Sequence, residues 1–174
     1  LAFVTAGLCT PEGVREAARE VRTSLGYKAH QPTAYTFLRR YLRWTGWTQE
    51  SFSLANYLIE LATIHCFALE FRPQTIAAAA AVLSRQYVAQ AARRPQTDGW
   101  KRRLLRCAHV DLLKELAPCT HALAQLHAAQ HNQPDLFVNR KYSLARFHAV
   151  VRIVAIPAPT PAFYAQYMVA EDVP

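Results

Sequence analysis

Apolar residues recur every three or four positions through most of this chain, and prolines and glycines interrupt the pattern at intervals. Such spacing is typical of amphipathic helices. The first predicted helix begins at Pro11, directly behind Thr10 as its N-cap, and ends at Gly26. A second helix is predicted after Thr33, another candidate N-cap, and it ends at Gly46.

Two strongly apolar blocks follow, and we predict that they form the core. Residues 51–67 carry a ridge of apolar side chains at helical spacing, on which His65 is expected to be buried. Pro73 opens the next helix, which contains five consecutive alanines at 77–81. Because this helix is apolar on all sides, we predict that it is the central, fully buried one.

Shorter segments divide the C-terminal half of the chain. A short helix is predicted over 100–108 and a long one over 110–131. Pro118 lies inside the long pattern, so the helix either starts late or kinks there. A last helix is predicted over 144–154, and the proline-rich residues 157–161 are expected to run extended.

Composition favours an all-α fold. Ten prolines and only five glycines argue against a β-sandwich or barrel, which needs glycine at many hairpins. With 52% hydrophobic and 18% charged residues, the 174-residue chain is no disordered tail and suits one ordinary domain or one domain with an appendage. The most apolar run, 77–83, is too short to cross a bilayer, so we expect no membrane partner.

The four cysteines give no sign of a zinc or redox site. No two of them have the two-residue spacing of a zinc ribbon or a redox dithiol. Each lies among apolar or helix-forming residues, where a free thiol packs as a small hydrophobe, and Cys119 in particular is expected in the core. Free thiols persist in a reducing compartment, so we predict a protein of the nucleus and cytoplasm. The other three are Cys9, Cys66 and Cys107.

No set of residues predicts a catalytic centre, and we expect a non-enzymatic protein with no cofactor and no metal. His127 and His131 are four apart on a predicted helix, but neither a glutamate nor a third ligand accompanies them. We therefore expect surface or helix-end histidines. Glu60 is a carboxylate in a strongly apolar helix, and we expect it to pair with Arg39 or Arg40 from the neighbouring helix.

Positive charge is concentrated in one segment. The net charge is +8, and residues 85–106 hold seven basic residues against Asp98. A cluster of this kind can neutralise phosphates of a nucleic acid or bind an acidic protein. Base stacking has little aromatic surface to use there, so a solvated face or an acidic protein partner is favoured. The predicted basic patch consists of Lys101, Arg102, Arg103 and Arg106.

The order of these blocks resembles the second cyclin box of cyclins of the mitotic A/B kind. Any one matching segment is weak, but six of them occur in the right order along the chain. They are 32–42 (PTAYTFLRRYL), 54–61 (LANYLIEL), 73–80 (PQTIAAAA), Trp100 with Leu104, 116–119 (LAPC) with Leu123, and 141–143 (KYS) with Phe147 and Val150.

The resemblance implies an all-α cyclin-box fold, which is a five-helix bundle around a buried central helix. Residues 1–30 resemble the end of an N-terminal cyclin box, with its last helix. Residues 31–131 resemble the C-terminal box, and residues 132–174 form a C-terminal helix and a proline-rich tail. Because the chain begins inside a structural element, we expect it to be a fragment of a longer protein.

Cyclins bind and activate cyclin-dependent protein kinases in cell-cycle control, so the resemblance implies a regulatory subunit with a kinase of that class as its partner. It places kinase contacts at Ala18, Arg22, Tyr27 and Ala29. In mitotic cyclins these positions are acidic, aliphatic, aromatic and aliphatic, and only Tyr27 keeps its character. Two alternatives stay open: a cyclin-fold module that binds nucleic acid, and a degenerate cyclin that acts as a protein scaffold.

Overall fold

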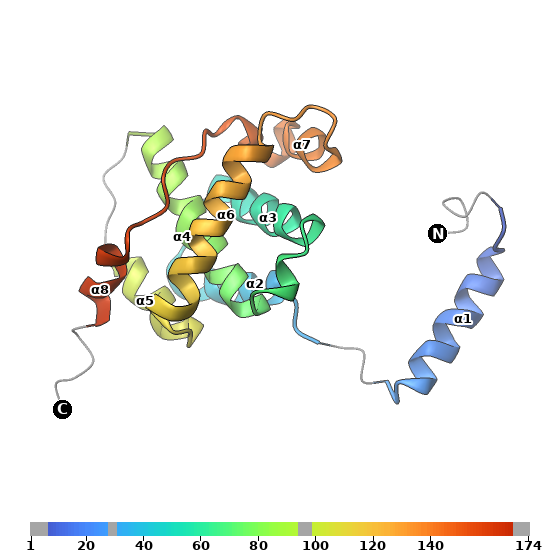
Figure 1. Ribbon diagram of the computed structural model, residues 1–174. Helices are drawn as coiled ribbons and strands as arrows, with labels where there is room; N and C mark the ends of the chain where they lie inside the picture. The colour runs from blue at the N-terminus through green and yellow to red at the C-terminus, as the bar shows by residue number, and fades with distance from the viewer. Residues whose placement is uncertain (1–6, 28–30, 94–98, 169–174) are drawn as a thin grey trace. The chain divides into compact units, whose positions relative to one another are not determined.

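The computed structural model describes residues 7–27, 31–93 and 99–168, and every regular element within these ranges is helical. Contacts between Cα atoms divide the chain into two compact units, Leu1–Pro32 and Thr33–Pro174. The first unit carries one helix, α1 (Pro11–Ser24), and the second carries the others (Figure 1). The prediction of an all-α fold is confirmed.

Helix α1 begins and ends where its capping residues predict. The Thr10 hydroxyl accepts a hydrogen bond from the backbone N–H of Gly13 at 3.1 Å, and Pro11 lies in the first turn, where its missing N–H is not needed. Gly26 has a φ of +55°, the left-handed conformation that ends many helices. No side chain of α1 is buried. Its apolar stripe consists of Val14, Ala18, Val21 and Leu25.

Helix α4 (Pro73–Ala91) is the central helix of the second unit, and Figure 1 shows the other helices of this unit gathered about it. Its five alanines at 77–81 are fully buried. Because an alanine side chain is a single methyl group, neighbouring helices approach α4 closely. The predicted central helix is therefore confirmed. Its neighbours are α2 (Ala34–Thr45), α3 (Gln49–Ile64), α5 (Gly99–Ala108) and α6 (Ala117–Gln130).

A π-helical turn, η2 (Leu112–Leu116), leads into α6. The backbone N–H of Leu116 bonds to the carbonyl of Asp111 at 2.9 Å, five residues back, and the Asp111 carboxylate caps the start of the turn. Pro118 lies in the first turn of α6. Of the two alternatives for this segment, the late start is the correct one, because proline is tolerated in a first turn but not in a helix interior.

His65 is exposed, so the prediction that it is buried on an apolar ridge is wrong. Helix α3 ends at Ile64, one residue before His65, so His65 is the C-cap residue and lies outside the helix. Cys66 then adopts a φ of +57° and turns the chain into a short 3₁₀ segment, η1 (Phe67–Leu69). The apolar ridge itself is buried, up to Leu61.

The helix predicted over 144–154 is also wrong. His148 and Ala149 have φ values of +60° and +49°, and a continuous right-handed helix contains no such residues. Residues 154–160 have no regular structure, as the prolines predict, but the helix that starts at Pro161 was not predicted. The elements of this part are α7 (Phe137–Tyr142), the 3₁₀ turns η3 (Ala145–Phe147) and η4 (Val150–Arg152), and α8 (Pro161–Met168).

Candidate protein-binding surfaces

Ala18 and Arg22, two of the residues that the resemblance places at kinase contacts, lie one turn apart on α1. Both are exposed, and Nε of Arg22 donates a hydrogen bond to the Ala18 carbonyl at 3.3 Å. Tyr27 follows the helix with a φ of +58°, and its side chain is 67% exposed. Ala29 lies outside the described residues. The described positions thus present a methyl group, a guanidinium and a phenol.

The C-terminal end of α1 carries positive charge. Arg22 lies in the last turn, where the helix macrodipole favours a cation. Position 18 offers no carboxylate with which a cation of a partner would pair, and its methyl group continues the apolar stripe of the helix. This end of α1 suits a partner surface that combines an apolar contact with a carboxylate or a free carbonyl oxygen.

The predicted basic patch is divided in the structure. Arg102, Arg103 and Arg106 are exposed on α5, with Arg106 three and four residues from the other two and therefore on the same side of the helix. Lys101 is only 8% exposed, and its Nζ lies 4.6 Å from the centre of the Phe163 ring in α8. Three cations are therefore accessible to a partner, and Lys101 contributes to the contact between α5 and α8.

Arg85 belongs to the basic segment of the sequence but faces inward. Its guanidinium carbon lies 4.5 Å from the ring centre of Trp100 and 5.8 Å from that of Trp47. Its Nη1 donates hydrogen bonds to the carbonyls of Thr45 at 3.2 Å and Gly46 at 2.5 Å, at the end of α2. Burial lowers the pKa of Arg85. This cation therefore holds α2, α4 and α5 together and is not offered to a partner.

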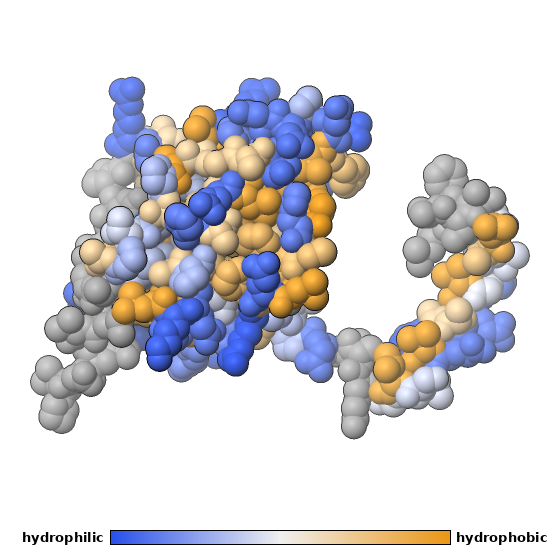
Figure 2. Space-filling view, viewed as in Figure 1, coloured by the Kyte–Doolittle hydropathy of each residue, from blue (hydrophilic) through white to orange (hydrophobic). Residues whose placement is uncertain are grey.

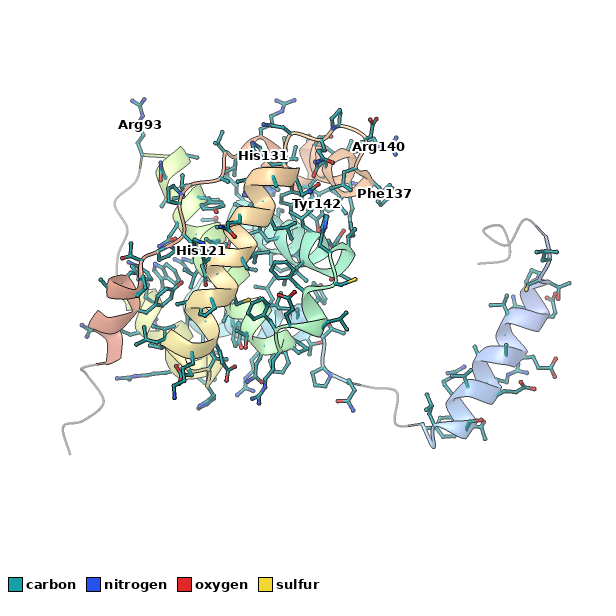
Figure 3. The ribbon with its side chains drawn as sticks, in the orientation of Figure 1. Arg93, His121, His131, Phe137, Arg140 and Tyr142 are labelled. Carbon is teal, nitrogen blue, oxygen red and sulfur yellow. The ribbon has the colours of Figure 1, made fainter. Side chains whose placement is uncertain are left out.

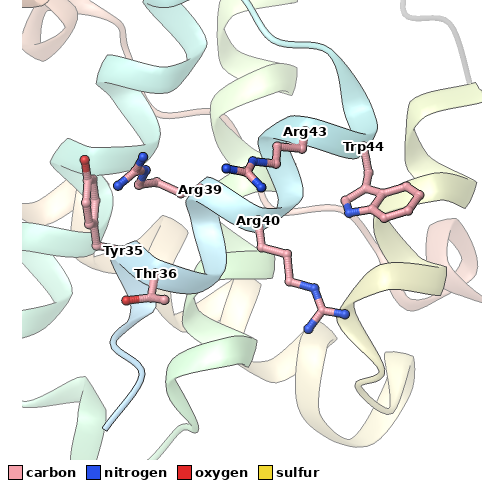
Figure 4. A pocket seen from close by; sticks show the side chains of 6 residues that line it. All are labelled: Tyr35, Thr36, Arg39, Arg40, Arg43 and Trp44. Atoms are coloured by element: carbon pink, nitrogen blue, oxygen red, sulfur yellow. The ribbon is translucent and has the colours of Figure 1, made fainter. Parts of the chain in front are cut away.

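The exposed side of α2 forms an open groove of about 780 Å³ that no motif in the sequence predicted (Figure 4). Three arginines line it, with one aromatic residue toward each end. The lining residues form two rows, 35–39–43 and 36–40–44, each with a spacing of four residues. That spacing is visible in the sequence and is the signal that would have found the groove. The lining residues are Tyr35, Thr36, Arg39, Arg40, Arg43 and Trp44.

His127 is fully buried in the last turn of α6, so of the two alternatives for this residue the helix-end position is correct and the surface position is wrong. Its ring stacks on Tyr87 at 5.4 Å and meets the ring of Tyr57 edge-on at 5.5 Å. Neither ring nitrogen has a hydrogen-bond partner in the described part of the chain. Burial, and secondarily His131, lower the pKa of His127 to about 4, so it is neutral at pH 7. No three His, Cys, Asp or Glu residues among those described are placed to hold a metal ion.

Glu60 is paired, as expected, but with α7 and not with α2. Its Oε1 accepts hydrogen bonds from Nζ of Lys141 at 2.6 Å and from the hydroxyl of Tyr142 at 2.8 Å. The prediction of Arg39 or Arg40 as the partner is wrong, because both point to the exposed side of α2. Burial, and then the Glu60 carboxylate, raise the pKa of Tyr142.

Cys119 and His121 point to opposite sides of α6. Cys119 is fully buried, as predicted, and burial raises the pKa of its thiol to about 12, whereas His121 is exposed (Figure 3). None of the helices within the described ranges is long and apolar enough to cross a membrane. On the face that Figure 2 shows, hydrophilic and hydrophobic side chains are interspersed. These features define an all-helical module.

Comparison with known proteins identifies the family of this module. The family model described as "Cyclin, C-terminal domain" matches residues 32–155. The chain therefore belongs to the cyclin family, whose members are non-catalytic regulatory subunits. The helical bundle of the second unit agrees with the fold of the C-terminal cyclin box.

The relatives confirm the resemblance to A- and B-type mitotic cyclins over most of the chain. Cyclin-A3-3 of Arabidopsis thaliana is 26% identical over 159 residues, which are 87% of this chain and 46% of that protein. Cyclin-A2-1 of Oryza sativa is 30% identical over 161 residues, which are 88% of this chain and 31% of that protein. G2/mitotic-specific cyclin-2 of Saccharomyces cerevisiae is 24% identical over 143 residues, which are 82% of this chain and 27% of that protein. The chain thus spans less than half the length of these relatives.

Proposed function

We propose that this chain is part of a cyclin-like regulatory subunit that binds and activates a cyclin-dependent protein kinase in cell-cycle control, in the nucleus and cytoplasm. The observation that carries the proposal is the family match over residues 32–155, together with relatives whose names are those of mitotic cyclins. On this proposal residues 1–30 end an N-terminal cyclin box, residues 31–131 are the C-terminal box, and residues 132–174 are an extension.

Activation by such a subunit is a population shift, in which the regulatory protein binds the active arrangement of the kinase more tightly than the inactive one. On this proposal Ala18 and Arg22 of α1, with Tyr27 and Ala29 further along the chain, contribute the end of the kinase interface, and the second unit is a supporting scaffold. The apolar stripe of α1 supports this assignment. An apolar stripe along one side of a helix is typical of packing against an apolar surface, such as the rest of a box.

A pull-down combined with a kinase assay tests the proposal, with the full-length parent protein as bait. That protein should co-purify with at least one cyclin-dependent kinase and raise its rate of phosphotransfer. Tyr27→Ala should weaken the association, because Tyr27 is the interface residue that keeps its aromatic character. Arg102→Ala, a matched exposed substitution on α5, should leave it unchanged. No binding and no activation of any kinase of this class would overturn the proposal.

A degenerate cyclin that scaffolds other proteins is the second candidate, and alanine at 18 with a guanidinium at 22 favours it. The double variant Ala18→Glu/Arg22→Leu separates the two candidates. If α1 contributes to a weakened kinase interface, the double variant should bind the kinase more tightly than the parent protein does. If the chain is a scaffold, kinase association should stay as it was.

A nucleic-acid-binding module is the third candidate, and the exposed Arg102, Arg103 and Arg106 are what favours it. Neutralisation of phosphates makes such binding steeply dependent on salt. A salt titration of DNA binding with Arg102→Gln/Arg106→Gln as the test variant checks this candidate. Absence of binding near physiological salt excludes it.

A further inference from the structure

Two parallel ridges of side chains run along the exposed side of α2. Tyr35, Arg39 and Arg43 are spaced by four residues, and so are Thr36, Arg40 and Trp44, which makes the two ridges neighbours on the helix surface. Figure 4 shows Arg39 and Arg43 extending to the same side of α2, and Arg40 extending away from them. One aromatic ring lies toward the N-terminal end of the first ridge and the other at the C-terminal end of the second.

The three guanidiniums of this groove have no acidic partner within the described parts of the chain. The sequence of α2 contains no Asp or Glu, and the ion pairs of Arg15 with Glu12 and of Lys141 with Glu60 lie elsewhere. Arg39 makes a cation–π contact with Tyr35, with 5.9 Å from Cζ to the ring centre. Three like charges over about 6 Å of helix axis repel one another, and a bound anion relieves that repulsion.

Apolar surface accompanies this charge. Trp44 is 58% exposed and Tyr35 is 47% exposed, whereas Leu38 and Tyr41 on the opposite side of α2 are buried in the core. About half of each exposed aromatic side chain is therefore accessible to a partner, although Tyr35 also lies beside Phe52 of α3. A tryptophan beside arginines is a combination that occurs at energetically important positions of protein–protein interfaces.

We propose that the α2 arginine groove binds an acidic segment of a partner protein, with carboxylates on Arg39 and Arg43, a further carboxylate on Arg40, and an apolar side chain against Trp44. Carboxylates four residues apart on a partner helix have the same spacing as Arg39 and Arg43 and meet them one to one. Arginine suits this task because its planar fork receives a carboxylate through two parallel hydrogen bonds.

The observations favour a peptide over a nucleic acid. The lining residues span about 14 Å of helix axis, and a strand that contacts three cations releases few counterions, so its affinity is small at physiological salt. The two aromatic rings lie at diagonally opposite ends of the groove, and successive bases do not find a continuous stacking platform there. Membership of the cyclin family, whose members act on protein partners, points to the same choice.

The proposal is independent of kinase activation and uses a different element of the fold. Arg39, Arg40 and Arg43 lie on α2, whereas the residues proposed for kinase contact, at positions 18–29, precede α2 in the chain. A chain whose groove is disabled should therefore still support whatever kinase activity the full-length protein has. Loss of peptide binding and loss of kinase binding are separable results.

Fluorescence anisotropy with the 174-residue chain tests the proposal. The probe is a labelled synthetic helical peptide with glutamates four residues apart and one leucine per turn, and the control is the same peptide with glutamine in place of every glutamate. We expect the glutamate peptide to bind at least about tenfold more tightly than the glutamine peptide, with a Kd in the micromolar range. Equal binding of the two peptides, or none, would overturn the proposal.

Variants locate the site. Arg39→Gln/Arg43→Gln should weaken binding of the glutamate peptide about fivefold or more, and Trp44→Ala should also weaken it. Arg102→Gln/Arg106→Gln on α5 removes the same charge and should change binding less than about twofold, because those residues lie outside the groove. Equal losses in the two double variants would mean that net charge alone attracts the peptide, and the proposal would fail.

Two further arms exclude other occupants. A single-stranded oligonucleotide that binds more tightly than the glutamate peptide, with the same sensitivity to Arg39→Gln/Arg43→Gln, would assign the groove to nucleic acid instead. Sedimentation of the chain alone detects a second copy as the occupant: a dimer that Arg39→Gln/Arg43→Gln dissolves would also overturn the proposal. The fluorescence of Trp44 is the difference between the fluorescence of the parent chain and that of Trp44→Phe. Acrylamide should quench this fluorescence less when a peptide is bound in the groove, because the peptide covers Trp44.

Discussion

The guanidinium of Arg85 stacks on the indole of Trp100, with 4.5 Å between its Cζ and the ring centre, and this contact joins α4 to α5. The same guanidinium donates hydrogen bonds to the carbonyls of Thr45 and Gly46, which lie at the end of α2. Carbonyls at a helix C-terminus have no partner within the helix. A single side chain from the central helix therefore satisfies the end of α2 and packs between two tryptophans.

Arg85→Ala should destabilise the second unit by about 2–4 kcal/mol, since it leaves the two carbonyls unpaired and removes packing against Trp47 and Trp100. Arg85→Lys keeps the charge but not the planar fork, and should still destabilise it by about 1–2 kcal/mol. Urea unfolding followed by tryptophan fluorescence measures this, because all three tryptophans lie in the second unit. Arg102→Ala is the exposed control and should stay within about 0.5 kcal/mol of the parent chain.

Local patterns predicted the parts of the fold that local forces decide. Thr10 and Gly26 bound α1 because a hydroxyl cap and a left-handed glycine act within a few residues. The five alanines predicted the central helix because no side of that helix is polar. The late start of α6 at Pro118 was one of two alternatives, and only the π-turn that precedes it decides between them.

Tertiary contacts decide what local patterns did not predict. Glu60 was expected to pair with an arginine of α2, but Lys141 and Tyr142 reach it from 81 and 82 residues further along the chain. No periodicity in a single sequence specifies such a pairing. The break at His148 and Ala149 is likewise invisible to spacing, because alanine rarely adopts a left-handed conformation and histidine, although enriched there, adopts it only in a minority of cases.

The surfaces were predictable to different degrees. The charge of α5 was evident in the sequence, but the inward position of Lys101 depends on a phenylalanine in α8, a helix that was not predicted. The arginine groove of α2 follows from helical spacing alone, since residues 39 and 43 must share a side once the helix exists. It was missed as a site because its residues belong to no motif with a known chemistry.

Glu60→Gln should lower the free energy of unfolding of the second unit by about 1 kcal/mol. The variant keeps an acceptor for the hydroxyl of Tyr142 but loses the charge that attracts Lys141, and the pair is partly exposed, with 37% and 29% of the two side chains accessible to solvent. Lys141→Met should have a similar effect. The double variant should lose less than the sum, with a coupling of about 0.5–1 kcal/mol.

Glu70→Gln is the control for that experiment, because Glu70 is exposed and outside this contact. It should leave the urea midpoint unchanged within error. Full additivity of the Glu60 and Lys141 substitutions would show that the two side chains do not stabilise each other, in spite of their 2.6 Å separation.

The second unit should lose stability as the pH falls from about 6.5 to about 4. The pKa of His127 in the folded protein is lowered to about 4 by burial, whereas a histidine in the unfolded chain has a pKa of about 6.5. Between these values the unfolded state binds a proton that the folded state does not, so protonation favours unfolding. The loss should approach about 3 kcal/mol at pH 4.

His127→Phe separates this effect from the titration of carboxylates over the same range. Phenylalanine keeps an aromatic ring against Tyr57 and Tyr87 and carries no titratable group. The stability difference between the two proteins, measured by urea unfolding at each pH, should shift in favour of the variant as the pH falls below 6.5. Parallel curves between pH 7 and pH 4 would mean that His127 does not titrate differently on folding.

Asn139→Asp should be more damaging than Tyr57→Phe, although the two side chains share one hydrogen bond between α7 and α3. The Asn139 amide nitrogen donates to the carbonyls of Gln130 at 2.7 Å and Gln133 at 2.8 Å, and its oxygen accepts from the hydroxyl of Tyr57 at 2.9 Å. An aspartate cannot donate to the two carbonyls and places a buried negative charge against them, so about 3–5 kcal/mol should be lost. Tyr57→Phe removes a single hydrogen bond and should lose about 1 kcal/mol, with thermal unfolding as the measurement. Protonation of the carboxyl group removes the charge and supplies one donor, so the deficit of Asn139→Asp should shrink as the pH falls. A deficit independent of pH would contradict this explanation.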